Sequence, residues 1–338
     1  MARLRRLLGT LLLILLLVLG AAAAGAWWGY HQFTTVGPLT ADNTVVVPRG
    51  SSVRAIAGQL ADAGVIKDPF LFRLGVRLFG QHKPLRAGEY LFPAGISAQT
   101  AMQQMIDGRQ IQHRLTIAEG LTNREVMELL AAAPDLGGDA PDLPSLGPEG
   151  SLLPETYFFM LGDSRADLVA RMKSSMDAAI AELWPARAQG LPFKDAKEAL
   201  ILASIVEKET GLPEERPHVA AVFLNRLAQG MALQSDPTVI YAITQGRSKL
   251  DRALTTKDLA IDSPFNTYVT AGLPPAPIAN PGRAAIEAVL HPAQNDDLYF
   301  VADGSGGHVF AKTLAEHNKN VAAWRKVQAQ KRTTTQSE

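Results

Sequence analysis

The first part of the hydrophobic pattern is a long apolar run at the N-terminus. Residues 7–28 are uncharged and mostly apolar, and a cluster of arginines precedes them. An α-helix rises about 1.5 Å per residue, so this run is long enough to cross a hydrocarbon core of about 30 Å. The pattern therefore predicts a short N-terminus at 1–6, a single transmembrane helix at 7–28 and a tether at 29–42.

The flanks of this run predict its orientation. Arg3, Arg5 and Arg6 precede it, and positively charged residues favour the cytoplasmic side of a membrane. Trp27 and Trp28 close it, as an aromatic belt at the far interface requires. We therefore expect the N-terminus in the cytoplasm and the rest of the chain outside. The alternative is a cleaved signal peptide, because small residues precede the tryptophans.

Short elements replace the apolar run from position 43 onward. Strand patterns and helical patterns with capping residues alternate over about 65 residues. The expected elements are a strand at Thr44–Val47, a helix after Ser51 or Ser52, a helix at Pro69–Phe79, a strand at Glu89–Phe92 and a helix after Ser97 that stops at Gly108. They form a small α/β domain at 43–110, for which a plain packing or spacer role stays open.

A larger domain is predicted at 111–326, mainly helical with a short sheet. It begins with a strand at Arg114–Ile117, and the segment Pro134–Gly150 is rich in Pro, Gly and Asp, which is typical of a surface loop. Near its end, Leu298–Ala302 and His308–Lys312 flank a glycine-rich turn and predict a hairpin. A closing helix and a polar tail at 327–338 complete an α+β chain.

Composition excludes several classes of function. The chain has 33 basic and 33 acidic residues, and this zero net charge argues against a nucleic-acid-binding protein. The seven His are scattered and there is no Cys, so no spacing typical of metal ligands is present. We therefore expect no metal, no cofactor and no nucleic-acid partner.

One helix carries an acidic residue in an apolar setting. The pattern predicts a helix from Asp195 to Gly211 that is apolar on nearly all sides, which is typical of a core helix. Glu207 lies in its last turns, where burial and the negative end of the helix dipole raise the pKa of a carboxyl group. Such a group suits general acid catalysis. The alternative is a helix-end glutamate in a salt bridge with Lys208 or Arg226.

A second carboxylate partner is not evident in this helix. Glu209 lies two residues further on, about 200° around the helix axis, so it points away from Glu207. Downstream, the start of another helix places Gln234, Ser235 and Thr238 at a loop mouth, where they can hydrogen-bond a polar ligand such as a sugar. The proline-bearing loops at 263–268 and 272–278 add an amide and an aromatic ring, although a purely structural role remains open for each residue.

Several long motifs resemble those of one family. They are Ala203-Ser-Ile-Val-Glu-Lys-Glu-Thr210, Phe223-Leu-Asn-Arg-Leu227, Leu233-Gln-Ser-Asp-Pro-Thr-Val-Ile-Tyr241, Asn266-Thr-Tyr268, Gly272-Leu-Pro-Pro275 and Tyr299-Phe-Val-Ala302, with weaker matches at Ala118–Thr122 and Pro154–Tyr157. In this order they resemble the YceG-like (MltG) family of endolytic murein transglycosylases. The resemblance covers nearly the whole chain and implies a LysM-like small domain and a catalytic Glu207.

Further expectations follow from the resemblance. It implies an inner-membrane protein with a periplasmic catalytic domain, which acts on peptidoglycan glycan strands beside lipid and wall polymerases. With the loop argument, the candidate substrate-binding residues are Asn225, Gln234, Ser235, Asp236, Thr238, Tyr241, Asn266, Thr267 and Tyr268.

A single acid favours a lytic reaction, because hydrolytic glycosidases generally need two carboxylates. In that reaction the acid protonates the glycosidic oxygen between N-acetylmuramic acid and N-acetylglucosamine, and the muramic 6-hydroxyl attacks to give a 1,6-anhydro end. Two alternatives remain. One is a non-catalytic peptidoglycan-binding scaffold, and the other is a hydrolytic muramidase, which needs a second carboxylate such as Asp236 near Glu207.

Overall fold

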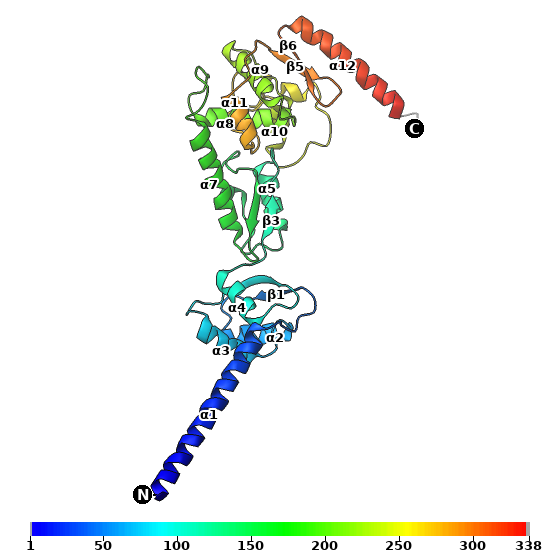
Figure 1. Ribbon diagram of the computed structural model, residues 1–338. Helices are drawn as coiled ribbons and strands as arrows, with labels where there is room; N and C mark the ends of the chain where they lie inside the picture. Colours follow the sequence, from blue (N-terminus) through cyan, green and yellow to red (C-terminus); the bar gives the residue numbers. More distant parts are fainter. Residues whose placement is uncertain (1, 336–338) are drawn as a thin grey trace. The chain divides into compact units, whose positions relative to one another are not determined.

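The computed structural model describes the backbone of residues 2–335 and has an α+β fold (Figure 1). The chain divides into two compact units, Met1–His113 and Arg114–Glu338. Each unit has its own buried apolar core.

Unit 1 has the predicted order of elements after the N-terminal helix. It contains α1 (Ala2–Thr34), β1 (Asn43–Val47), α2 (Val53–Asp62), α3 (Pro69–Phe79), β2 (Gly88–Phe92) and α4 (Ala98–Asp107). β1 and β2 are antiparallel, with Val45 opposite Tyr90. The strand side chains that point inward, Tyr90 and Phe92, pack with Phe72 of α3 and Met105 of α4 in a common core.

The N-terminal helix is longer than predicted. Residues 6–34 of α1 are long and apolar enough to cross a membrane. The helix continues to Thr34, so residues 29–34, predicted as part of a tether, are helical. The reason is tertiary, because Phe33 is 3% exposed and packs into the core of the small domain. The apolar helix therefore ends inside a folded domain.

Unit 2 is mainly helical, with two short two-stranded sheets. Its elements are β3 (His113–Thr116, whose first residue closes unit 1), α5 (Asn123–Ala132), α6 (Leu143–Leu146), β4 (Thr156–Phe159), α7 (Arg165–Leu183), α8 (Ala196–Glu209), α9 (Arg216–Ala228), α10 (Asp236–Thr244), η1 (Asp258–Ala260), α11 (Arg283–Leu290), β5 (Tyr299–Ala302), β6 (His308–Ala311) and α12 (Leu314–Thr335). β3 pairs with β4. The predicted hairpin is confirmed, because β5 and β6 are antiparallel with Phe300 opposite Phe310.

Two segments predicted as irregular contain helix. The loop 134–150 includes α6, whose first turn is capped when the Asp142 carboxylate accepts a hydrogen bond from Ser145 N. The segment predicted as a polar tail begins inside α12, which continues to Thr335. Its Ala, Gln, Lys and Arg residues are strong helix formers, so the local sequence sustains a helix there.

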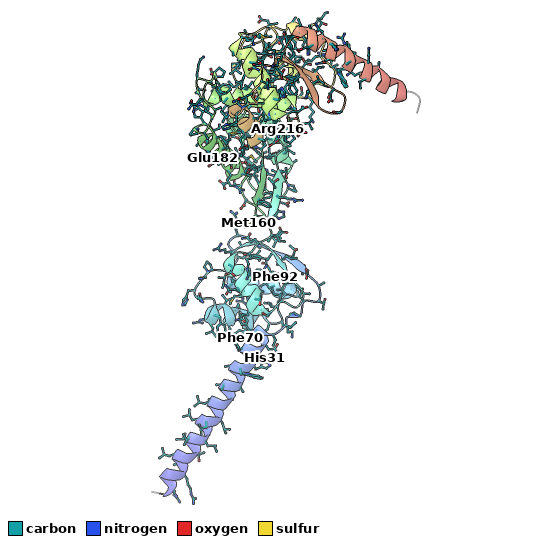
Figure 2. All side chains as sticks on the ribbon, turned by 45° about the horizontal axis from the view of Figure 1, so that its top comes forward. His31, Phe70, Phe92, Met160, Glu182 and Arg216 are labelled. Atoms are coloured by element: carbon teal, nitrogen blue, oxygen red, sulfur yellow. The ribbon has the colours of Figure 1, made fainter. Side chains whose placement is uncertain are left out.

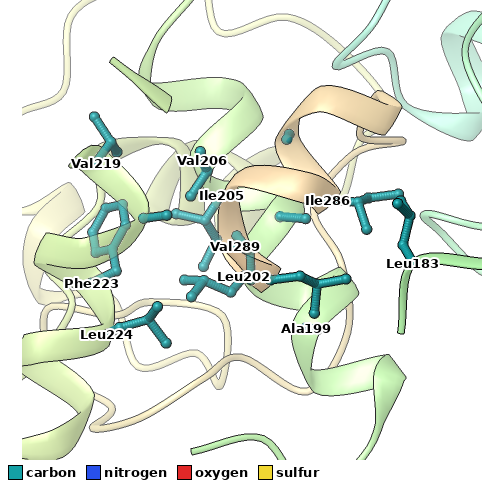
Figure 3. Close-up of a cluster of buried hydrophobic side chains, with 14 of the residues drawn as sticks. Leu183, Ala199, Leu202, Ile205, Val206, Val219, Phe223, Leu224, Ile286 and Val289 are labelled. Atoms are coloured by element: carbon teal, nitrogen blue, oxygen red, sulfur yellow. The ribbon is translucent and has the colours of Figure 1, made fainter. Parts of the chain in front are cut away.

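The core helix of unit 2 is α8, as its pattern predicts. Leu202, Ile205 and Val206 are fully buried, and α9 and α11 pack against the same helix (Figure 3). Burying one such side chain stabilises a fold by about 1.5–3 kcal/mol. Asp195 caps the helix start by accepting a hydrogen bond from Glu198 N, whereas the helix ends at Glu209 with an extended Thr210 as C-cap, one residue before Gly211. This packing fixes the last turn of α8 in place.

Candidate functional site

Glu207 is buried at the end of α8. Its side chain is 4% exposed. The oxygen Oε2 accepts a hydrogen bond from Gly282 N at 2.8 Å, and Oε1 lies 3.4 Å from Nη2 of Arg216, the first residue of α9. The expected burial of this side chain is therefore present, but the groups at its carboxylate are polar and charged rather than apolar.

The cation beside Glu207 differs from the two that the sequence suggested. Lys208 instead donates a hydrogen bond to the carbonyl oxygen of Gly120. Arg226 donates to the carbonyl oxygens of Leu298 and Leu233. The expected alternative of a salt-bridged glutamate is therefore present in part: Glu207 is in a salt bridge, but its partner is Arg216 rather than Lys208 or Arg226, which donate to backbone carbonyls.

A second carboxylate faces Glu207 across Arg216. Oε2 of Glu119 lies 3.1 Å from Nη2 of Arg216, so one guanidinium nitrogen contacts both carboxylates. The Glu119 side chain is 42% exposed and the Arg216 side chain 9%. Sequence reasoning missed both residues, and the weak motif at Ala118–Thr122 was the signal that pointed to the first of them. Arg216 is labelled in Figure 2.

The surroundings of Glu207 oppose ionisation. Burial is the largest effect and raises the pKa of Glu207 above its ordinary value of 4.5, and the negative charge of Glu119 adds to this rise. The Gly282 N–H and the positive charge of Arg216 act in the opposite direction. The net effect is a carboxyl group whose proton is retained to higher pH, next to donors that can stabilise it once the proton has left.

A buried amide holds the loops of this site together. Asn280 is fully buried, and its side chain donates to Leu121 O and Asn123 Oδ1 and accepts from Leu152 N. Its carbonyl oxygen accepts from Gly120 N. The loop that carries Glu119 is thereby joined to the segment that ends in Gly282.

The Glu119 side chain lies against Gly282, in the place that a larger residue at position 282 would occupy. The φ of Gly282, −74°, is accessible to any residue. A Cβ atom there would overlap the carboxylate of Glu119, however. Glu119, Arg216, Glu207 and the Gly282 peptide therefore form one packed group, which we call the Glu207 site.

Three predicted substrate-binding residues lie together at another pocket. Gln234, Asp236 and Tyr268 line a cavity of about 410 Å³ that also borders Glu209. The Tyr268 hydroxyl donates to Asp236 Oδ1 at 2.6 Å, and Ser235 Oγ donates to Glu209 Oε1 at 2.5 Å. Burial raises the pKa of Glu209 to about 7, with a further rise from the charge of Asp236. We call this the Glu209 pocket.

Asp236 thus lies beside Glu209. The carboxylate of Asp236 accepts a hydrogen bond from the Tyr268 hydroxyl. The charged residues that act on Glu207 are instead Glu119 and Arg216. The muramidase alternative called for a second carboxylate near Glu207, such as Asp236, and the carboxylate near it in the structure is Glu119.

The other predicted contacts are mostly inside the protein. Asn225 ties α9 to the carbonyl oxygens of Asn295 and Asp297. Ser235, Thr238 and Thr267 form a buried hydrogen-bonded group, and Asn266 donates to Leu259 O and Ile261 O. These five residues, Asn225, Ser235, Thr238, Asn266 and Thr267, support the loops that present the Glu209 pocket.

Tyr241 lines a further cavity, of about 510 Å³, together with Thr122 and Lys208. Its hydroxyl pairs with Glu149, and burial raises the pKa of that glutamate to about 7. Because Lys208 also binds the loop that carries Glu119, this cavity lies on the same side of α8 as the Glu207 site. Among residues 2–335 there is no cluster of three or more His, Asp or Glu side chains arranged to hold a metal ion.

Comparison with known proteins finds one family and several relatives that match most of the chain. The model of the YceG-like family matches residues 45–323. A Bacillus subtilis protein named endolytic murein transglycosylase is 35% identical over 301 residues, which cover 81% of this chain and 82% of that protein. A Streptococcus pneumoniae protein of the same name is 29% identical over 326 residues. The match covers 82% of this chain and 58% of the length of the Streptococcus pneumoniae protein.

A solved structure agrees with these relatives. The 2.6 Å crystal structure of a YceG-like protein from Listeria monocytogenes matches with a TM-score of 0.53 and 32% identity. It covers 82% of this chain and 98% of the crystallised one. The family model spans the segment that contains the Glu207 site, and the chain belongs to the YceG-like family.

Proposed function

We propose that this protein is a membrane-anchored lytic transglycosylase that cleaves peptidoglycan glycan strands, with Glu207 as the catalytic acid. Two relatives with this activity in their names support the reaction class. The observation that carries the proposal is the Glu207 carboxyl group itself, which is 4% exposed, has a raised pKa and has two hydrogen-bond donors at its oxygens.

The proposed reaction needs one acid that later acts as a base. Glu207 gives its proton to the oxygen that leaves C1 of N-acetylmuramic acid, and the C1–O bond breaks. The 6-hydroxyl of the same sugar then forms a bond to C1, and Glu207 takes the proton of that hydroxyl. The product is a 1,6-anhydro end, and no water is consumed.

The neighbours of Glu207 suit the charge that develops on it. When the proton leaves, the carboxylate is stabilised by the Gly282 N–H and by Arg216. Glu119 holds Arg216 from the other side and, by its negative charge, favours the return of the proton. This arrangement suits a group that must ionise and recover within one cycle.

Hydrolysis is the second candidate, because Glu119 supplies a carboxylate near the acid. In that reaction the Glu119 carboxylate would act as the base for an attacking water. Against this role, the Glu119 carboxylate is ion-paired with Arg216, and it fills the space above Gly282. The names of the relatives also favour transglycosylation.

The remaining parts of the proposal concern place and substrate contacts. We place α1 across the inner membrane with a cytoplasmic N-terminus, and unit 2 in the periplasm, where it cuts within nascent strands beside wall polymerases. Gln234, Asp236, Tyr241 and Tyr268, which border cavities, contact the strand. The small domain is LysM-like.

Digestion of purified sacculi by the full-length protein tests the reaction. The wild type should release glycans with anhydro ends, each lighter by one water than the corresponding hydrolytic product in mass spectra. Glu207→Gln should reduce release by roughly 100-fold to 10,000-fold, as expected for loss of a general acid. Products with reducing ends would favour the hydrolytic alternative. Binding without any cleavage by the wild type would favour the scaffold.

A further inference from the structure

Helix α3 of the small domain has an apolar face that points away from the core. Phe70 is 61% exposed, Leu74 40% and Leu78 64%. These residues are spaced by four, so they follow one another along one side of the helix. Phe72 and Gly75 on the opposite side are buried. The helix is therefore apolar on its core face and on much of its outer face, whereas a water-exposed outer face is normally polar.

This helix packs directly against the last turns of α1. The ring of Phe79 contacts the rings of Tyr30 and Phe33, with centroids 5.9 and 5.8 Å apart. Leu71 lies against Gly29. In Figure 1, α3 lies at the end of unit 1 that α1 enters, and Figure 2 labels Phe70 and His31 at that same end, with Phe92 further away. The helix that carries the exposed apolar face is thus in contact with α1 at residues 29–33.

Positive charges border the apolar side chains of α3. At about 100° per residue, Arg73 and Arg77 follow one another along the edge of the stripe formed by Phe70, Leu74 and Leu78. The Arg73 guanidinium lies over the Phe70 ring, with 5.9 Å between its central carbon and the ring centroid. Apolar side chains flanked by arginines are typical of helices that lie in the plane of a membrane interface.

We propose that α3 lies in the headgroup region of the same bilayer that α1 crosses, with Phe70, Leu74 and Leu78 inserted and with Arg73 and Arg77 at lipid phosphates. The proposal rests on the membrane anchor assigned to α1 above. Lipid is the occupant because α3 meets α1 at residues 29–33, directly beyond the tryptophans expected at the interface. The charge of the arginines matches anionic headgroups.

The chain offers a direct test because it has no cysteine, so a single introduced cysteine takes a fluorophore at one known place. Three full-length variants are compared in vesicles that contain brominated lipids, which quench fluorophores in the bilayer. Leu17→Cys reports on the anchor, and Leu78→Cys reports on α3. Leu91→Cys is the matched control, because this leucine is 46% exposed and lies on β2 rather than on α3.

The expected result is loss of fluorescence at positions 17 and 78 and retained fluorescence at position 91. Quenching at 17 without quenching at 78 overturns the proposal for α3 and leaves the anchor intact. Absence of quenching at 17 overturns the anchor, and the proposal for α3 falls with it. The label at 78 can also stay unquenched while its emission shifts when the protein is diluted with excess lipid. Such a shift means that a protein partner, which separates on dilution, covers α3, and it also overturns the proposal.

The arginines provide an independent readout. Replacing zwitterionic vesicles by vesicles that contain an anionic lipid should increase quenching at position 78. In a Leu78→Cys protein that also carries Arg73→Gln and Arg77→Gln, this increase should be lost. An increase that persists in the triple variant contradicts the role assigned to the arginines.

Discussion

Glu207 and Glu209 lie two residues apart on α8 and share the chemical property that first suggests an acid catalyst. Burial raises the pKa of both carboxyl groups. Their partners differ, because Glu207 contacts a guanidinium and a peptide N–H, whereas Glu209 accepts a hydrogen bond from the neutral hydroxyl of Ser235.

The difference lies in what happens after the proton leaves. Around Glu207, two donors stabilise the carboxylate and so lower the free-energy cost of losing the proton. Beside Glu209, the negative charge of Asp236 opposes ionisation, and the positive groups, His308 and Arg226, act on it through charge alone. Burial raises the pKa of both carboxyl groups, and the donors around Glu207 distinguish it as the one whose ionised form is directly stabilised.

The largest expected effect separates the two glutamates by activity. Glu207→Gln and Glu209→Gln each replace a carboxyl group by an amide of the same size in the same helix. The first should lose roughly 100-fold or more of glycan release, and the second should stay within about threefold of the wild type, because a glutamine at 209 still accepts the Ser235 hydrogen bond. Quantified anhydro ends from sacculi measure both. Equal losses would show that the donors do not distinguish the two sites.

The second prediction concerns stability and pH. The pKa of Glu209 is about 7 in the folded chain and about 4.5 when exposed, so the folded state binds more protons between these values. Stability is thus fully present below about pH 4.5 and falls as pH rises to about 7, by about 3 kcal/mol from this residue. In urea denaturation, Glu209→Gln should lose correspondingly less stability over that range, and an unchanged loss would contradict the assignment.

The third prediction concerns the charge beside Glu207. The charged groups that face it are Glu119 from the loop before α5 and Arg216 from α9, and Lys208 on its own helix is bonded to Gly120. Because an acid must be protonated, activity falls as pH rises through its pKa. Glu119→Gln should lower the pKa of Glu207 and move the alkaline limb of the pH–rate profile to lower pH, by about 1 pH unit. Arg216→Met should move the limb upward.

Two further variants sharpen this test. Gly282→Ala keeps every charge and displaces the Glu119 carboxylate, so it should produce a smaller shift in the same direction as Glu119→Gln. Asp177→Asn removes one exposed negative charge from α7 and serves as the control. Movement of the limb in the control, or in the same direction for Glu119 and Arg216, would indicate that another group sets the profile.

The smallest expected effect is that of a substitution in the Glu209 pocket. Tyr268→Phe removes the hydrogen bond to Asp236 and costs about 1 kcal/mol of stability. If this pocket holds part of the glycan, KM should rise about fivefold with little change in kcat. A decrease in kcat of the size seen for Glu207→Gln would mean that the two sites share the reaction.

Local chemistry made much of the fold predictable. Ser97 caps α4 by accepting from Thr100 N, and Gly108 ends it in a left-handed conformation at φ +72°. Asp68 and the proline after it start α3 at the expected residue. These signals act within a few residues of one another, so a linear sequence displays them directly.

The surroundings of Glu207 were not predictable in this way. Arg216 contacts Glu119 from 97 positions away, and Gly282 meets Glu207 from 75 positions away. No local period encodes such pairs, because they depend on how α8, α9 and α11 pack. Burial of Phe33 also follows from tertiary packing, and it converted a predicted tether into helix.

The buried amide of Asn280 has a consequence for how the active enzyme comes into being. It joins the Glu119 loop, the segment before Gly282 and the backbone at Leu152 by hydrogen bonds that do not involve any ligand. The conformational entropy lost in aligning these three stretches is therefore lost when the chain folds. On the proposed function, a glycan that arrives later meets a site already in order, so its binding energy is not needed to order these loops.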